Sequence, residues 1–229
     1  MLDVHAPHIK LHGFGEFLVH LLTITVGLLI ATQIESCVEW RHHVHLAQEA
    51  RASLRLEIEH NLSDLKEART GLKLWRKQVR ADLLAMQRIQ DHPDDPEAQH
   101  TSLQVNASGI PLRDTAWRTA QSTGALAYMP YEEAERYSGI YQAQSALLDS
   151  EDKPTEDVAA ILGLINKYHW GKDSKITREQ AGAIAEKLGQ MEFHLSRGDA
   201  VLQWAIEQNS AFLENRKPAT SFTAEITTQ

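Results

Sequence analysis

Apolar and polar positions divide the chain into one unbroken apolar segment followed by long stretches of periodic pattern. Residues 17–34, between Glu16 and Glu35, carry no formal charge and are mostly apolar. As an α-helix this segment would be roughly 27 Å long, about the thickness of the hydrocarbon core of a bilayer. The pattern predicts a transmembrane helix, assigned to residues 16–37, behind an N-terminal tail of residues 1–15.

Two other interpretations of the apolar segment stay open. The first is a buried core helix, although such helices are usually shorter or have a polar face. The second is a cleaved signal peptide, because Ile34-Glu-Ser-Cys37 weakly resembles a lipoprotein cleavage site whose cysteine would be lipidated. Glu35 inside that site, and Lys10 as the one basic residue before it, argue against cleavage.

One face of the predicted transmembrane helix carries small and polar residues at spacings of three and four. These are His20, Thr23, Gly27, Ala31 and Glu35. Small residues spaced in this way let two helix backbones approach closely in lipid. The stripe predicts packing against another transmembrane helix, in a homo-oligomer or a larger membrane complex; a helix surrounded by lipid alone is the alternative.

The periodic part of the chain predicts amphipathic helices. Apolar residues recur three or four positions apart from Val44 to Met86, with a break near Gly71 left open, and Pro93 ends the pattern. Asp114 is expected to cap a short helix that ends at Gly124. Pro130 is expected in the first turn of a second helix, and Pro154 at the start of a third. The predicted apolar face of the second helix comprises Ala134, Tyr137, Tyr141 and Leu148. The pattern Thr177-x-x-Gln180 resembles a capping box at the start of a long last helix.

These elements predict an all-α protein. Its N-terminal transmembrane helix continues into a soluble helical bundle of residues 38–217, with two long helices and two or three short ones. The apolar face of the last helix is expected to comprise Ala181, Ile184, Leu188, Met191, Leu195, Leu202, Ile206 and Leu213. Residues 218–229 form a threonine-rich tail that we expect to be disordered.

Charge narrows the possible partners. The formal net charge is −8, and no face rich in lysine and arginine is evident, which argues against nucleic acid. The lipid bilayer and another transmembrane helix are the expected partners.

Arg41, Arg51 and Arg55 follow the apolar segment, whereas Lys10 and the α-amine precede it, so the positive-inside tendency favours a cytoplasmic bundle. Cys37 is the one cysteine, which excludes an internal disulfide.

Histidine is abundant, with 12 residues in the chain. His42 and His45 are three positions apart, so both could reach one metal ion or one anionic lipid head group. The other interpretation is interfacial, because Trp40, Arg41, His42 and His43 suit the boundary between lipid and water. His20 within the segment is a weaker candidate as a ligand of haem or a pigment.

The sequence contains no recognisable catalytic constellation. Glu-x-x-His occurs at Glu39/His42 and at Glu57/His60, but 18 residues of one helix separate the two motifs by roughly 27 Å, too far to share a metal pair. No phosphate-binding glycine loop, metalloprotease motif or nucleophile elbow is present. The sequence predicts no catalytic residue and no cofactor.

Two stretches of the sequence resemble an uncharacterised bacterial family of single-pass membrane proteins with one N-terminal transmembrane helix. The first combines Met1–His8, Phe17–His20, Gly27–Ala31 and Val38–His45; the second combines Thr115–Gly124 with Tyr131–Tyr141. The resemblance implies a protein of the bacterial inner membrane. It also implies that Trp117, Gly124, Pro130 and Tyr141 belong to the packing of the soluble fold.

The functional hypothesis is therefore a non-catalytic, membrane-anchored scaffold or accessory subunit. The alternative is a metal or pH sensor that works through the histidines after the apolar segment, since histidine changes charge near neutral pH. An enzyme of unrecognised type is the third interpretation.

Overall fold

The computed structural model describes residues 13–104, 109–171 and 174–219, and these residues form helices and no strand. The helices are α1 (Phe14–Asp91), α2 (Pro96–Gln99), α3 (Thr115–Ser122), η1 (Ala125–Tyr128), α4 (Tyr131–Ser150), α5 (Asp152–Lys167) and α6 (Arg178–Leu213). The predicted all-α class with two long helices is confirmed. Most of the predicted tails, residues 1–15 and 218–229, lies outside the described residues, and so do His5, His8, Lys10 and His12.

The chain separates into two compact units, Met1–Glu49 and Ala50–Gln229. In the first unit the described residues are helical from Phe14 onward. This part of α1 contains the one described segment that is long and apolar enough to cross a membrane, and none of its apolar window is buried.

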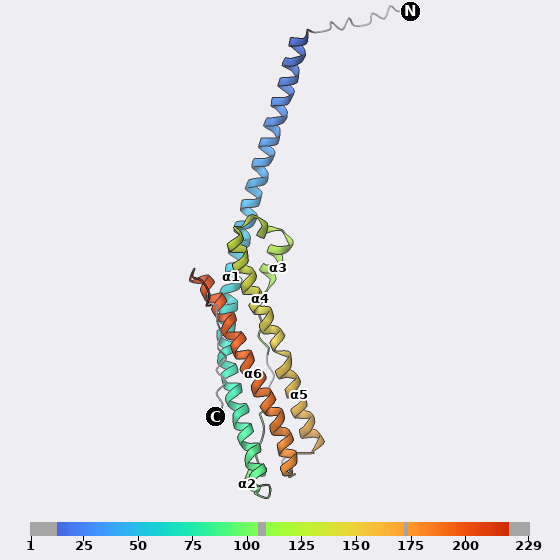
Figure 1. The fold of residues 1–229 in the computed structure, drawn as a ribbon, viewed down its shortest axis with the longest axis vertical. Coiled ribbons are helices and arrows are strands. Elements are labelled where there is room, and N and C mark those ends of the chain that lie inside the picture. The colour runs from blue at the N-terminus through green and yellow to red at the C-terminus, as the bar shows by residue number, and fades with distance from the viewer. Residues whose placement is uncertain (1–12, 105–108, 172–173, 220–229) are drawn as a thin grey trace, which may run out of the picture. The chain divides into compact units, whose positions relative to one another are not determined.

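The second unit is a bundle of three helical columns (Figure 1). The part of α1 from Ala50 onward forms the first column, α4 followed by α5 forms the second, and α6 forms the third. The first two columns run in the same direction, and α6 returns antiparallel to them. Helix α1 continues through Gly71 without the break that the sequence left open.

Among the described residues, two clusters of buried side chains make up much of the core of the bundle. One joins α1, α5 and α6 and includes Val79, Met86, Ile161, Leu188 and Met191. The other joins α1, α4 and α6 and consists of Leu65, Ala143, Leu147, Leu202 and Ala205. Burial of such side chains is the main source of the bundle's stability.

The face predicted for α6 is confirmed except at its C-terminal end. Six of the eight predicted positions, Ala181 through Leu202, are buried. Ile206 and Leu213 are only partly buried, whereas Ala205 and Asn209 are fully buried.

The face predicted for α4 needs a correction. Tyr137 and Tyr141 are buried as expected, but Leu148 is 41% exposed and Leu147 is buried in its place. Ile140 and Gln144 complete the buried face. The spacing of 3.6 residues per turn allows either Leu147 or Leu148 to follow Gln144, and contact with α6 favours Leu147.

The helix termini explain where the chain turns. Thr177 and Gln180 form the predicted capping box of α6, with both reciprocal hydrogen bonds present. Gly124 lies between α3 and η1 at φ 71°, a left-handed conformation that glycine adopts without steric penalty. Asp114 directly precedes α3, as predicted. The prediction that its side chain caps the helix is wrong, because the side chain makes no capping hydrogen bond. Its carboxylate pairs with Arg118 at 2.9 Å.

Candidate functional site

The stripe predicted on the apolar segment lies on the exposed surface of α1. His20, Thr23, Gly27, Ala31 and Glu35 are all exposed, and apart from the adjoining residues and backbone of α1 itself, no described atom lies within 4 Å of a Cβ built on Gly27. The structure therefore contains no partner for this face among the described residues, and the predicted helix–helix contact stays a prediction.

Hydroxyl groups in the apolar segment are satisfied within α1 itself. Thr23 donates to the carbonyl oxygen of Val19 and Thr25 to that of Leu21, each at 2.8 Å. Thr32 and Ser36 make equivalent bonds to Leu29 and Thr32. These bonds leave the segment without an unpaired hydroxyl hydrogen, which lowers the free energy of transfer into lipid.

The histidines that follow the segment do not form a closed metal site. The rings of His42 and His43 lie 6.0 Å apart, and His45 Nε2 lies 3.1 Å from a carboxylate oxygen of Glu49. In the described part of the chain, no three His, Cys, Asp or Glu side chains are grouped around one position that could hold an ion. Trp40 is 65% exposed and Arg41 is exposed, as the interfacial interpretation requires.

A buried polar network that the sequence pattern did not predict begins at Glu57 in the bundle. The Glu57 carboxylate accepts hydrogen bonds from the Tyr141 hydroxyl at 2.6 Å and from the backbone N–H groups of Ala116 and Trp117 at 2.8 and 3.3 Å. Glu57 thereby caps the N-terminus of α3, the role predicted for Asp114, and a negative charge there is favourable. Because these bonds occupy the carboxylate, Glu57 is not a free ligand in the Glu57/His60 motif.

A second part of the network connects α1, α4 and α6 through amide side chains. Asn61 donates to the carbonyl oxygen of Arg113 at 2.7 Å and accepts from the Arg113 N–H at 3.0 Å. It also donates to Gln144, which in turn donates to Asn209. All three amides are buried. Buried polar groups that are fully paired in this way fix the register of neighbouring helices.

A sequence signal for this network existed. Glu57 and Asn61 occupy positions of the apolar stripe between Leu54 and Leu65, spaced by three and four residues. A polar residue on the buried face of a helix requires a partner. The sequence alone does not identify that partner, because Tyr141 and Gln144 lie more than 80 residues away.

Aromatic packing supports the role that the family resemblance gave to α3 and α4. The rings of Trp117 and Tyr141 stack at 4.9 Å with an interplanar angle of 8°. Burial is the main cause that raises the pKa of the Tyr141 hydroxyl, and its hydrogen bond to Glu57 raises it further. Tyr141 is therefore a hydrogen-bond donor throughout the physiological range.

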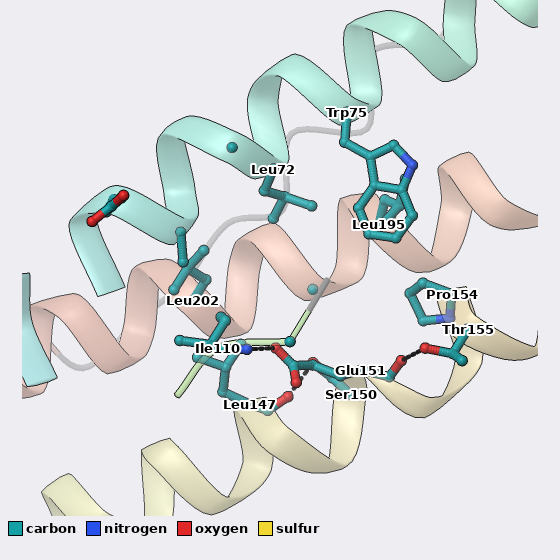
Figure 2. Close-up of a pocket in the computed structure, with 15 residues that line it drawn as sticks. Leu72, Trp75, Ile110, Leu147, Ser150, Glu151, Pro154, Thr155, Leu195 and Leu202 are labelled. Atoms are coloured by element: carbon teal, nitrogen blue, oxygen red, sulfur yellow. Dashed lines mark hydrogen bonds between the residues drawn. The ribbon is translucent and has the colours of Figure 1, made fainter. Parts of the chain in front are cut away.

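A cavity of about 260 Å³ lies between the two core clusters of the bundle. Leu72 and Trp75 of α1, Leu195 and Leu202 of α6, and Leu147 of α4 form most of its apolar wall (Figure 2). Gly71, Gly109 and Gly198 also line it. Gly109 and Gly198 leave room where α4 is followed by α5, because a Cβ built on them would lie 3.6 Å from Glu151 Oε2 and 3.9 Å from Ser150 Oγ.

Glu151 contributes a carboxylate to the wall of the cavity. Its carboxylate accepts a hydrogen bond of 3.1 Å from the backbone N–H of Ile110, and the two residues face each other in Figure 2. Burial raises the pKa of Glu151, the hydrogen bond from Ile110 opposes this, and the charge of Asp152 adds to the rise. No described lysine, arginine or histidine lies within ion-pair distance of Glu151.

Two further polar features lie near the same helices. The indole N–H of Trp75 is buried and has no hydrogen-bond partner among the described residues. Arg76 and Arg80 of α1 pair with Glu192 of α6 at 2.9 and 2.8 Å, and these ion pairs join the two long helices.

Comparison of the chain with models of protein families, with curated proteins and with solved structures found no match.

Proposed function

We propose that this protein is a non-catalytic scaffold or accessory subunit anchored in the bacterial inner membrane. In this proposal Phe17–Ile34 crosses the bilayer and the bundle of the second unit lies in water, on the cytoplasmic side. The observation that carries the proposal is the full exposure of the apolar segment: none of the apolar window is buried in the protein. Leu22 and Leu28, for example, are 64% and 62% exposed.

The physical argument is the cost of such a surface in water. Burying one leucine side chain is worth about 1.5–3 kcal/mol, and the segment exposes many comparable side chains. Exposed apolar patches of this extent mark contact with a membrane or a partner. The satisfied hydroxyls of Thr23, Thr25 and Thr32 support lipid as the surroundings, because hydrocarbon offers no replacement hydrogen bonds.

The segment is also proposed to pack against another transmembrane helix. Gly27 lies at the middle of the stripe that includes Thr23 and Ala31, and open space surrounds it in the described structure. Without a side chain at Gly27, a second helix can approach the backbone closely.

The test compares Gly27→Leu with Thr25→Leu, a small-to-large change on the opposite face of the same helix. Each variant is expressed at native level, extracted in mild detergent, and analysed for assembly size and co-purifying proteins. We expect Gly27→Leu to reduce the assembly or lose its partner and Thr25→Leu to leave both unchanged. The packing role is wrong if the two variants behave alike. Release of the wild-type chain from membranes by alkaline carbonate would contradict the anchor itself.

A further inference from the structure

The cavity beside Glu151 has the properties of a ligand site rather than of a packing defect. Its volume of about 260 Å³ exceeds that of the roughly 150 Å³ cavities that accept benzene in other proteins. Its walls are mostly apolar, and they include the carboxylates of Glu67 and Glu151. Pockets for small molecules typically combine a hydrophobic lining with a few fixed polar groups.

The charged side chains that line the cavity favour a ligand that carries a positive charge. Its described lining contains two carboxylates, Glu67 and Glu151, and no basic side chain. A ligand with an anionic head group, such as a fatty acid, would bring a third negative charge to these two. A cation would instead be attracted by both.

Glu151 in particular lacks a counterion. One backbone hydrogen bond from Ile110 is the only one recorded for its carboxylate among the described residues, and burial disfavours its ionised form. A hydrogen-bonding cation next to the carboxylate would offset that desolvation. An ammonium group fits this role, since it supplies three donors on a compact centre.

The apolar wall defines the remainder of the ligand. Leu72, Leu195 and Leu202 give an aliphatic surface, and Trp75 adds an aromatic ring that can contact either an apolar group or a cation. The volume limits the body to one aromatic ring or a short alkyl chain.

We propose that this cavity binds a small apolar amine. The ammonium group of the ligand pairs with the carboxylate of Glu151, and the ring or alkyl body lies against Leu72, Trp75 and Leu195. The site belongs to the bundle alone and does not depend on what the apolar segment contacts.

The experiment is calorimetric titration of the full-length protein in detergent with three molecules of similar shape. They are 2-phenylethylamine, which is cationic, 2-phenylethanol, which is neutral, and 3-phenylpropionate, which is anionic. We expect saturable binding of the amine, weaker binding of the alcohol, and none of the anion. The three molecules also partition into detergent micelles. Because this partitioning is the same for every variant, its contribution to the measured heat cancels when variants are compared.

Two variants test separately how the charge of Glu151 and the space of the cavity contribute to binding. Glu151→Gln should weaken amine binding by at least about tenfold and leave binding of the alcohol unchanged, because it removes the charge and keeps the shape. Gly198→Leu should abolish binding of both by filling the cavity. The matched control is Gly189→Leu on the same helix, an exposed position where no described atom beyond the adjoining residues and backbone of α6 lies within 4 Å of a built Cβ.

Three results would overturn the proposal. The first is equal affinity for the amine in wild type and Glu151→Gln. The second is binding of 3-phenylpropionate as tight as that of the amine. The third is that the wild-type protein binds neither 2-phenylethylamine nor hexylamine saturably. Helicity and the unfolding midpoint are measured for each variant. If Gly198→Leu does not fold, Ala68→Leu fills the same cavity from α1, and the Glu151→Gln comparison decides the charge independently.

Discussion

Tyr141 of α4 and Glu57 of α1 are joined by a hydrogen bond of 2.6 Å between residues 84 positions apart in the sequence. The same carboxylate holds the first turn of α3 through the N–H groups of Ala116 and Trp117. One buried acidic side chain therefore connects three helices, and three hydrogen-bond donors depend on it.

The first prediction concerns the removal of this acceptor. Glu57→Ala should lower the free energy of unfolding by about 2–4 kcal/mol, because it leaves three donors without their partner in a buried site. Tyr141→Phe should cost about 1–2 kcal/mol, since it removes one donor only. Chemical denaturation in detergent, followed by circular dichroism, measures both.

The control for this pair is Tyr131→Phe, because Tyr131 is 80% exposed. Its effect should stay within about 0.5 kcal/mol. In the double variant Glu57→Ala/Tyr141→Phe the two losses should not add fully, since both single variants remove the hydrogen bond between Glu57 and Tyr141. Full additivity would show that the two side chains are energetically independent.

The second prediction concerns the N-terminal cap of α6. Thr177→Ala removes the side-chain acceptor for the Gln180 N–H and should destabilise the protein by about 1 kcal/mol. Thr70→Ala is the comparison, because the Thr70 hydroxyl is exposed and bonds only to a carbonyl oxygen of its own helix. Equal losses for the two variants would argue against the capping box as a source of stability.

The third prediction concerns how Glu151 makes the free energy of unfolding depend on pH. Its pKa is raised above the ordinary value of 4.5 in the folded protein, so folding favours the protonated form. The stability contribution of this group is therefore complete below pH 4.5 and is lost as the pH rises through the folded-state pKa. Glu151→Gln, which resembles the protonated acid, should match the wild type near pH 4 and be the more stable protein at pH 7.

Denaturation curves at several pH values test the direction of this change in stability. The exposed Glu135→Gln is the matched control, and its stability relative to wild type should stay within about 0.5 kcal/mol throughout. A Glu151→Gln variant that loses stability relative to wild type as the pH rises would show that a cation in the protein stabilises the carboxylate.

The fourth prediction distinguishes a retained anchor from a signal sequence. The intact mass of the protein purified from membranes should correspond to a chain that keeps residues 17–34, with an unmodified thiol at Cys37. A mature chain beginning at Cys37 and carrying a lipid would instead identify a lipoprotein. Such cleavage would remove Gly27 and with it the basis for the proposed helix packing.

The fifth prediction concerns the orientation of the anchored protein. A cysteine introduced at the exposed position Ser63, in a Cys37→Ser background, reports on the side of the membrane where the bundle lies. With a cytoplasmic bundle, a membrane-impermeant maleimide should label it only after the cells are broken. Labelling of intact spheroplasts would place the bundle on the opposite side.

The sequence by itself determined the helical class, the apolar segment and several helix ends. These features depend on neighbours within a few residues. The spacing of Ala181, Ile184 and Leu188 defines a helix face, and the Thr177–Gln180 pair defines a cap. Gly124 marks a helix end for the same reason, because a left-handed residue is needed there.

Only the tertiary structure decided which distant residues meet. Glu57 and Asn61 were recognisable as polar residues within an apolar stripe, but nothing local indicates that Tyr141 and Arg113 would be their partners. The cavity beside Glu151 was equally hidden, because it depends on glycines and small residues of separate segments that come together only when three helical columns pack. Contacts between positions far apart in the chain are set by the packing of whole helices, and local periodicity carries no record of that packing.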